Sequence, residues 1–144
     1  MGSTPTPGTS VLRMPQPPAL TATLALWVGL GGALGSLLRL VTGDLIRRLV
    51  PDAGFPWPTL LINVIGSLVI GAFLRWADQS GAGPAPRAFV AIGLCGGFTT
   101  FSTFAVENLA LLQGGQPGRA AAYALASCVL TVGAAFAGYR LAGG

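Results

Sequence analysis

The sequence predicts an all-α integral membrane protein with four transmembrane helices, and two observations lead to this fold class. Charged residues make up 8% of the 144-residue chain, hydrophobic residues make up 52%, and the mean hydropathy is +0.70. A soluble domain averages about 25% charged residues, so this chain has too few charges to cover a surface in water. Four apolar segments, each near the length that crosses a hydrocarbon core of roughly 30 Å, are separated by links rich in glycine and proline.

The chain divides into a tail, 1–18, and a transmembrane domain, 19–144. The tail holds five prolines and no apolar run, so we expect it to be disordered and not a signal peptide. The expected spans are 19–38, 57–74, 88–106 and 120–139, with the first continuing past Arg39 and the third past Glu107 to Leu112. Barrel strands would be shorter and would alternate in polarity, so the spans are predicted to be helices.

The positive charges are spread almost evenly over the two sides of the membrane. All eight Lys/Arg residues are arginines, without a basic run, which favours contact with lipid head groups and argues against nucleic-acid binding. Insertion direction follows the Lys/Arg imbalance of short loops. A chain with almost no such imbalance can insert in both directions and pair as an antiparallel, dual-topology homodimer. The alternative is a single topology set by a subtler signal. One side carries Arg13, Arg75, Arg87 and Arg140, and the other carries Arg47, Arg48 and Arg119; Arg39 is left out because it is expected to lie within the first helix.

Polar side chains recur every four residues in the second and fourth spans, which places them on one face of each helix. One interpretation is interhelical hydrogen bonding, worth about 0.6–2 kcal/mol per contact in membranes. Two such stripes together favour the other interpretation, a polar track for a permeating species. The stripes are Thr59, Asn63 and Ser67 in the second span, and Tyr123, Ser127 and Thr131 in the fourth.

Two charged residues are expected to be embedded, Arg39 and Glu107. Arg39 can snorkel to the interface, pair with Asp44, or supply positive potential to a vestibule. Small residues also recur at the spacing of close helix contacts: Gly31 with Gly35, and Gly93 with Gly97. The two cysteines lie in apolar segments and the chain has no histidine, so we predict neither a disulfide, nor a cluster of metal-binding side chains, nor an enzyme.

The segment 93–104, GLCGGFTTFSTF, is a poor helix, because glycine and threonine both lose helical stability relative to alanine. A break at this depth frees backbone carbonyls, which in transporters hold a cation such as Na⁺. If the helix resumes after the break, Phe101 and Phe104 share a face, and the positive edges of their rings can meet an anion. Hydroxyl and amide donors for a small anion are Thr100, Ser102, Thr103 and Asn63.

The sequence resembles the Fluc (CrcB) family of fluoride channels over all four spans, roughly residues 29–139. GLCGGFTTFSTFAVE is similar to the family pattern G-x-x-G-G-x-T-T-F-S-T-F-x-x-E, TLLINVIGS to its second-helix motif, and GGALGSLLR to its first-helix segment. The resemblance implies a dual-topology antiparallel homodimer in the inner (plasma) membrane, with two fluoride pores and a structural Na⁺ at its centre. It also implies passive export of fluoride down its electrochemical gradient.

The resemblance also assigns roles to individual residues. The Na⁺ would be held by the backbone carbonyls of Gly96 and Thr99, Arg39 would lie near a vestibule, and Glu107 would lie at a pore end. One departure is Pro58, where family members usually have glycine; proline lacks an N–H, although the first helical turn has spare N–H groups. The fluoride pore would be lined by Phe101, Phe104, Asn63, Ser127, Tyr123, Thr103 and Ser102.

Two other functions compete with a fluoride channel. A proton-coupled small multidrug exporter also has four short helices, but it needs a carboxylate in the first span, which here has no acid before Asp44. A structural membrane subunit would use the polar stripes only to join helices.

Overall fold

The computed structural model describes residues 19–50 and 54–143, which form four long helical segments. The first is α1 (Ala22–Leu49) and the second is α2 (Trp57–Gln79). The third consists of α3 (Pro84–Arg87), the π-helical turns η1 (Ala88–Leu94), α4 (Cys95–Phe98) and α5 (Phe101–Gln113), and the fourth is α6 (Pro117–Leu141). The expected tail, 1–18, lies outside the described residues.

Each of the four segments is long and apolar enough to cross a membrane. The prediction of an all-helical protein with four spans is therefore confirmed, including the extension of the first span beyond Arg39 and of the third beyond Glu107. Large apolar side chains such as Leu26, Leu37 and Val129 are exposed on the outside of the helices. This distribution suits contact with lipid rather than with water.

Local sequence signals explain where the helices start and turn. Thr21 precedes α1 and its Oγ1 accepts a hydrogen bond from the Leu24 N–H at 3.2 Å, as an N-cap does. Proline occupies the first turn of α2 and of α6, where a missing N–H costs nothing. The turns after α2 and α5 use Gly81 and Gly115 at φ +64° and +69°, a conformation that favours glycine.

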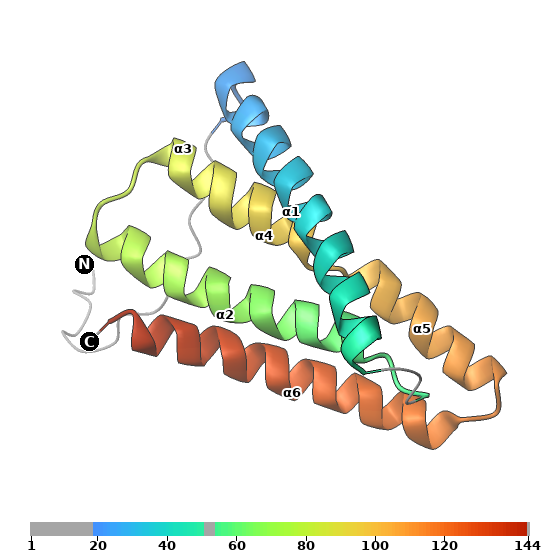
Figure 1. The fold of residues 1–144 in the computed structure, drawn as a ribbon. Helices are drawn as coiled ribbons and strands as arrows, with labels where there is room; N and C mark the ends of the chain where they lie inside the picture. The colour runs from blue at the N-terminus through green and yellow to red at the C-terminus, as the bar shows by residue number, and fades with distance from the viewer. Residues whose placement is uncertain (1–18, 51–53, 144) are drawn as a thin grey trace, which may run out of the picture.

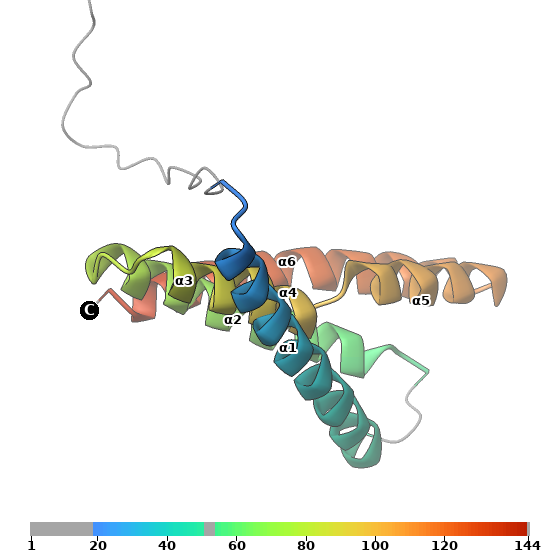
Figure 2. The ribbon, with the colours of Figure 1, turned by 90° about the horizontal axis from the view of Figure 1, so that it is seen from above.

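Two tight helix pairs organise the fold. α2 packs along α6, and α1 packs across η1 and α4; Figures 1 and 2 show α1 crossing the other helices at a steep angle. A Cβ on Gly31 or Gly35 would overlap the backbone of the third segment, and a Cβ on Gly93 or Gly97 would overlap that of α1. The predicted close contacts of these four glycines are confirmed, because small residues let helix backbones approach.

The third segment changes conformation within the motif 93–104. α4 ends at Phe98, and Thr99 (φ −81°, ψ 161°) and Thr100 (φ −153°, ψ 117°) are extended before α5 begins at Phe101. Gly96 and Gly97 remain helical, although their low helix propensity led us to include them in the non-helical part. The helix is interrupted at the two threonines because the backbone of Thr100 forms hydrogen bonds with a residue outside this segment, as described below.

Candidate ion pathway

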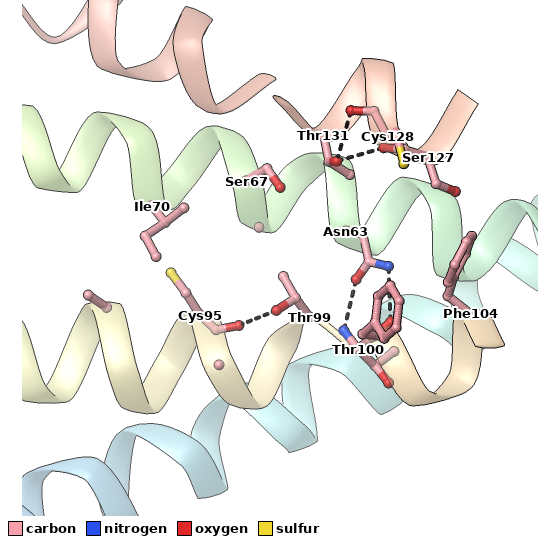
Figure 3. Close-up of a pocket in the computed structure, with 14 residues that line it drawn as sticks. Asn63, Ser67, Ile70, Cys95, Thr99, Thr100, Phe104, Ser127, Cys128 and Thr131 are labelled. Carbon is pink, nitrogen blue, oxygen red and sulfur yellow. Dashed lines mark hydrogen bonds between the residues drawn. The ribbon is translucent and has the colours of Figure 1, made fainter. Parts of the chain in front are cut away.

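A cavity of about 350 Å³ lies where α2, α4, α5 and α6 meet. Figure 3 shows Asn63 of α2 facing Thr100, with the polar side chains of α6 nearby. The lining contains hydroxyls, an amide and two phenyl rings but no charged side chain. The residues that line this smaller cavity are Asn63, Gly66, Ser67, Ile70, Ala91, Cys95, Gly96, Thr99, Thr100, Phe101, Phe104, Ser127, Cys128 and Thr131.

A pair of hydrogen bonds between Asn63 and Thr100 holds the extended segment. The Thr100 N–H donates to Asn63 Oδ1 at 2.8 Å, and Asn63 Nδ2 donates to the Thr100 carbonyl at 3.1 Å. These bonds replace the helical partner of the Thr100 N–H, the Gly96 carbonyl. An amide group has two N–H donors, so one Asn63 hydrogen is left for another acceptor.

The Thr100 side chain caps α5. Its Oγ1 accepts from the Thr103 N–H at 3.2 Å, donates to Thr103 Oγ1 at 3.0 Å, and lies 3.2 Å from Ser102 Oγ. Thr100 is buried and lines both the smaller cavity and a second, larger one. From the sequence, Thr100 was predicted only as one of several hydrogen-bond donors. Its position between the two cavities depends on the fold.

The larger cavity has a volume of about 1140 Å³ and lies between α1, the start of α2 and α5. Two arginines of α1, Arg39 and Arg47, line it together with Glu107 and Thr103. Arg39 and Arg47 are eight residues apart and thus lie on the same face of the helix. Arg47 was not among the predicted site residues, although its spacing from Arg39 is visible in the sequence.

Arg39 does not pair with Asp44. Asp44 Oδ2 instead accepts from Arg48 Nε at 2.8 Å, four residues along the same helix. Arg39 Nη1 donates to the Thr99 carbonyl at 3.3 Å, so its guanidinium reaches the extended segment. Of the three interpretations of Arg39, pairing with Asp44 is wrong, and the vestibule stays a prediction; Arg39 lines the larger cavity.

Glu107 connects three of the four spans. Its Oε1 accepts from Thr59 Oγ1 and its Oε2 accepts from the Tyr123 hydroxyl, both at 2.7 Å. Tyr123 is completely buried, with 0% of its surface exposed. The first residues of the two polar stripes therefore meet on one carboxylate, which sequence spacing within each helix did not reveal.

Ser127 is the exception among the buried polar groups. The residue is 8% exposed, and its Oγ is the one buried side-chain N or O atom without a hydrogen-bond partner in residues 19–50 and 54–143. Thr131, one turn later, donates to the Ser127 carbonyl at 2.6 Å. An unpaired hydroxyl is costly in an apolar interior, and this one lines the smaller cavity.

The rings of Phe101 and Phe104 lie side by side, with centroids 5.3 Å apart, so the prediction that they share a face of the resumed helix is confirmed. Phe104 also packs against Tyr123 at 5.0 Å. Phe101 is 79% exposed in the single chain. Both rings line the smaller cavity.

The structure distributes the predicted site residues over the two cavities. Asn63, Ser127, Phe101 and Phe104 line the smaller cavity, as do Gly96 and Thr99, whereas Arg39, Thr103 and Glu107 line the larger one. Tyr123 and Ser102 line neither of these cavities. Within the described part of the chain, no three Asp, Glu, His or Cys side chains gather to hold a metal ion.

The fold and the site define a small integral membrane protein with two open cavities that carry polar side chains between apolar helices. The chain belongs to the CrcB-like family: the family model described as "CrcB-like protein, Camphor Resistance (CrcB)" matches residues 26–139. This assignment confirms the resemblance drawn from the three sequence motifs.

Similar proteins in several bacteria are named fluoride-specific ion channel FluC. One from Thermus thermophilus is 51% identical over 118 residues, which cover 82% of this chain and 94% of that protein. The proteins of Rhizobium meliloti (45% identical; 81% and 93% covered) and Novosphingobium aromaticivorans (42%; 85% and 96%) are also similar. Together with the four helices that are apolar and long enough to cross a membrane, these channel relatives confirm the prediction of a multi-pass inner-membrane protein. The family assignment confirms that the protein is not an enzyme.

Proposed function

We propose that this chain is a fluoride-selective channel that exports cytoplasmic fluoride passively. The observation that carries the proposal is the smaller cavity, which combines two phenyl rings with unused hydrogen-bond donors and has no charged side chain in its lining. The relatives named as fluoride-specific channels, at 42–51% identity, support the choice of ion.

Fluoride is small and strongly hydrated, so its path must replace water with donors. The Ser127 hydroxyl, which has no partner, and the second N–H of Asn63 supply two donors to the smaller cavity. The edges of the Phe101 and Phe104 rings add partial positive charge. Without a full positive charge in this cavity, the anion is bound weakly enough to leave again, as conduction requires.

The larger cavity serves as the vestibule of this pathway. Arg39 and Arg47 raise the local concentration of anions there, and Thr100 lies between the vestibule and the smaller cavity. The negative charge of Glu107 is spread over hydrogen bonds from Thr59 and Tyr123, which lowers its repulsion of an anion. Thr103 lines the vestibule, and Tyr123 and Ser102 act by holding their neighbours.

The functional unit of the proposal is an antiparallel, dual-topology homodimer with two pores. Phe101 and Gly96 line the smaller cavity and are exposed in the single chain, and in the proposed dimer a second copy covers them. The nearly equal number of arginines on the two sides supports insertion in both directions.

A structural Na⁺ at the centre of this dimer is part of the proposal. Carbonyl oxygens are suitable ligands for Na⁺, and the Gly96 carbonyl has lost the Thr100 N–H to Asn63. The Thr99 carbonyl accepts one bond from Arg39 and has a second lone pair. The two carbonyls of each copy would hold the ion, and the ion would join the two copies. Dimer stability in Na⁺ compared with K⁺ or N-methylglucamine, measured by light scattering, tests this role; equal stability in all three contradicts it.

Efflux from liposomes tests the channel. Purified protein is reconstituted in vesicles loaded with either fluoride or chloride, and release is followed with ion-selective electrodes. Rapid fluoride release with negligible chloride release is expected, and release of neither ion contradicts the proposal. Phe101→Ile and Phe104→Ile should abolish efflux in a folded protein, whereas Phe136→Ile, on the exposed face of α6, should retain it.

Cysteine labelling in intact cells tests the dual topology. In a chain whose two cysteines are replaced by alanine, a single cysteine at Gln116, between α5 and α6, is treated with a membrane-impermeant maleimide. About half of the molecules should react if the chain inserts in both directions. Labelling of all or of none shows a single orientation.

A further inference from the structure

Five aromatic rings form a continuous row from the first residue of α2, through the loop before it, to the smaller cavity. Phe55, in this loop, packs on Trp57 with centroids 4.8 Å apart and edge-on against Tyr123 at 5.4 Å. Tyr123 contacts Phe104 at 5.0 Å, and Phe104 contacts Phe101 at 5.3 Å. The row therefore joins a loop residue to both rings that line the cavity.

Tyr123, in the middle of the row, has little freedom to move. It is completely buried, and its hydroxyl donates to Glu107 at 2.7 Å. Phe55 packs on its ring from the loop, and Phe104 packs on it from α5. In a close-packed interior a ring reorients only when a neighbour gives way, so the position of Phe55 constrains Tyr123, and Tyr123 constrains Phe104.

The loop that carries Phe55 is itself anchored. Arg119, in the first turn of α6, donates from Nη1 to the Gly54 carbonyl at 3.2 Å and to Gln116 Oε1 at 2.9 Å. Gly54 has φ +58°, a conformation that a residue with a side chain rarely adopts. Phe55 also lines the larger cavity. Its ring is thus held between the vestibule and Tyr123.

We propose that Phe55 is a positioning residue of the ion pathway, acting through Tyr123 to orient the ring of Phe104 toward the smaller cavity. The proposal rests on the proposed channel function. A smaller side chain at position 55 leaves space beside Tyr123, so the Tyr123 and Phe104 rings gain alternative orientations. A permeating anion then meets the positive edge of Phe104 less often.

The ring contact can be tested without any transport measurement. The chain has two tyrosines, Tyr123 and Tyr139, so labelling with 3-fluorotyrosine gives two ¹⁹F NMR signals, which the variant Tyr123→Phe assigns. Phe55→Ala and Phe55→Leu should shift or broaden the Tyr123 signal and leave that of Tyr139 in place. Phe89→Leu, in an aromatic pair with Trp27 outside the row, is the control and should change neither the position nor the width of the Tyr123 signal.

Fluoride efflux then tests the positioning role. Phe55→Ala should lower efflux roughly 2- to 10-fold, the size expected from losing one aromatic contact. Phe55→Tyr keeps the ring, so it should keep both wild-type efflux and the wild-type Tyr123 signal. An unchanged Tyr123 signal overturns the proposal, and so does a changed signal with wild-type efflux. Absence of efflux from the unmodified protein contradicts the channel function instead, and the NMR comparison still decides the ring contact. If Phe55→Ala does not fold, Phe55→Leu and Phe55→Tyr make the same comparison.

Discussion

Along the seam between α2 and α6 backbone packs against backbone, whereas at the junction between α4 and α5 the backbone is held by side chains. In the seam, a Cβ on Gly71 would overlap the Ala135 carbonyl, and one on Gly138 would overlap the Leu68 carbonyl. At the junction, Asn63 bonds both the N–H and the carbonyl of Thr100. The seam satisfies its backbone groups within each helix and leaves no space at these two glycines, while the junction gives up helical bonds and borders two cavities.

The difference shows how a membrane protein combines a rigid frame with a polar path. Backbone groups in an apolar environment must be bonded, and regular helices achieve this without any help from neighbours. A helix can be interrupted only where another element supplies partners, and here a single asparagine on α2 does so. Substitutions at four places test this contrast.

The largest effect is expected from filling the seam. Gly71→Leu and Gly138→Leu place a side chain where backbone atoms already lie, and because a backbone cannot move aside as a side chain can, the cost should exceed the roughly 1–3 kcal/mol of ordinary overpacking. We expect strong loss of thermal stability in detergent, measured by the fraction of protein that stays monodisperse after heating. Gly133→Leu, on the same helix as Gly138 with no atom within 4 Å of its Cβ position, is the control. Similar stability of all three variants would show that the seam tolerates a side chain.

The second-largest effect is expected from removing the hydrogen bonds that Asn63 makes to the junction. Asn63→Leu leaves the N–H and the carbonyl of Thr100 without partners, at a cost of about 1–3 kcal/mol for each unsatisfied group. We expect lower thermal stability and loss of fluoride efflux. Asn63→Gln keeps both the amide acceptor and the amide donor, so it should be the less destabilised of the two. Wild-type stability of Asn63→Leu would contradict the role given to these two bonds.

Ser127 separates function from stability at the same site. Its buried Oγ has no partner, so Ser127→Ala should keep or raise thermal stability, because a costly unpaired hydroxyl is removed, while lowering fluoride efflux about tenfold, the value of one hydrogen bond to an ion. Thr131→Val, whose hydroxyl bonds the backbone of its own helix, should lower efflux less. Efflux at the wild-type level in Ser127→Ala would remove this hydroxyl from the pathway.

The smallest effect concerns the vestibule. Arg39→Gln should lower efflux about 2- to 5-fold at low ionic strength, and the loss should shrink as salt screens the charge. Arg48→Gln removes the same charge from a residue that pairs with Asp44 and lines neither cavity, so its efflux should stay near wild type. Equal effects of the two variants would indicate that only net charge matters.

Much of the fold follows from the sequence because a bilayer allows few solutions. Length and hydropathy were sufficient to predict four helical spans. The spacing of the glycines was sufficient to predict the close helix contacts of Gly31, Gly35, Gly93 and Gly97. The periodicity of the polar stripes also predicted which side chains face the interior. The place at which the third segment leaves the helix was less well predicted, since propensity pointed to Gly96 and Gly97 as much as to the threonines.

The sequence by itself determined the composition of the site: an asparagine, hydroxyls, two phenylalanines and an embedded arginine. Only the tertiary structure decided their partners. Arg39 bonds the Thr99 carbonyl and not Asp44, Glu107 accepts from Thr59 and Tyr123, and Ser127 is left without a bond. The physical reason is that hydrogen bonds between helices depend on how the helices cross, and the crossing is set by close backbone packing at glycines.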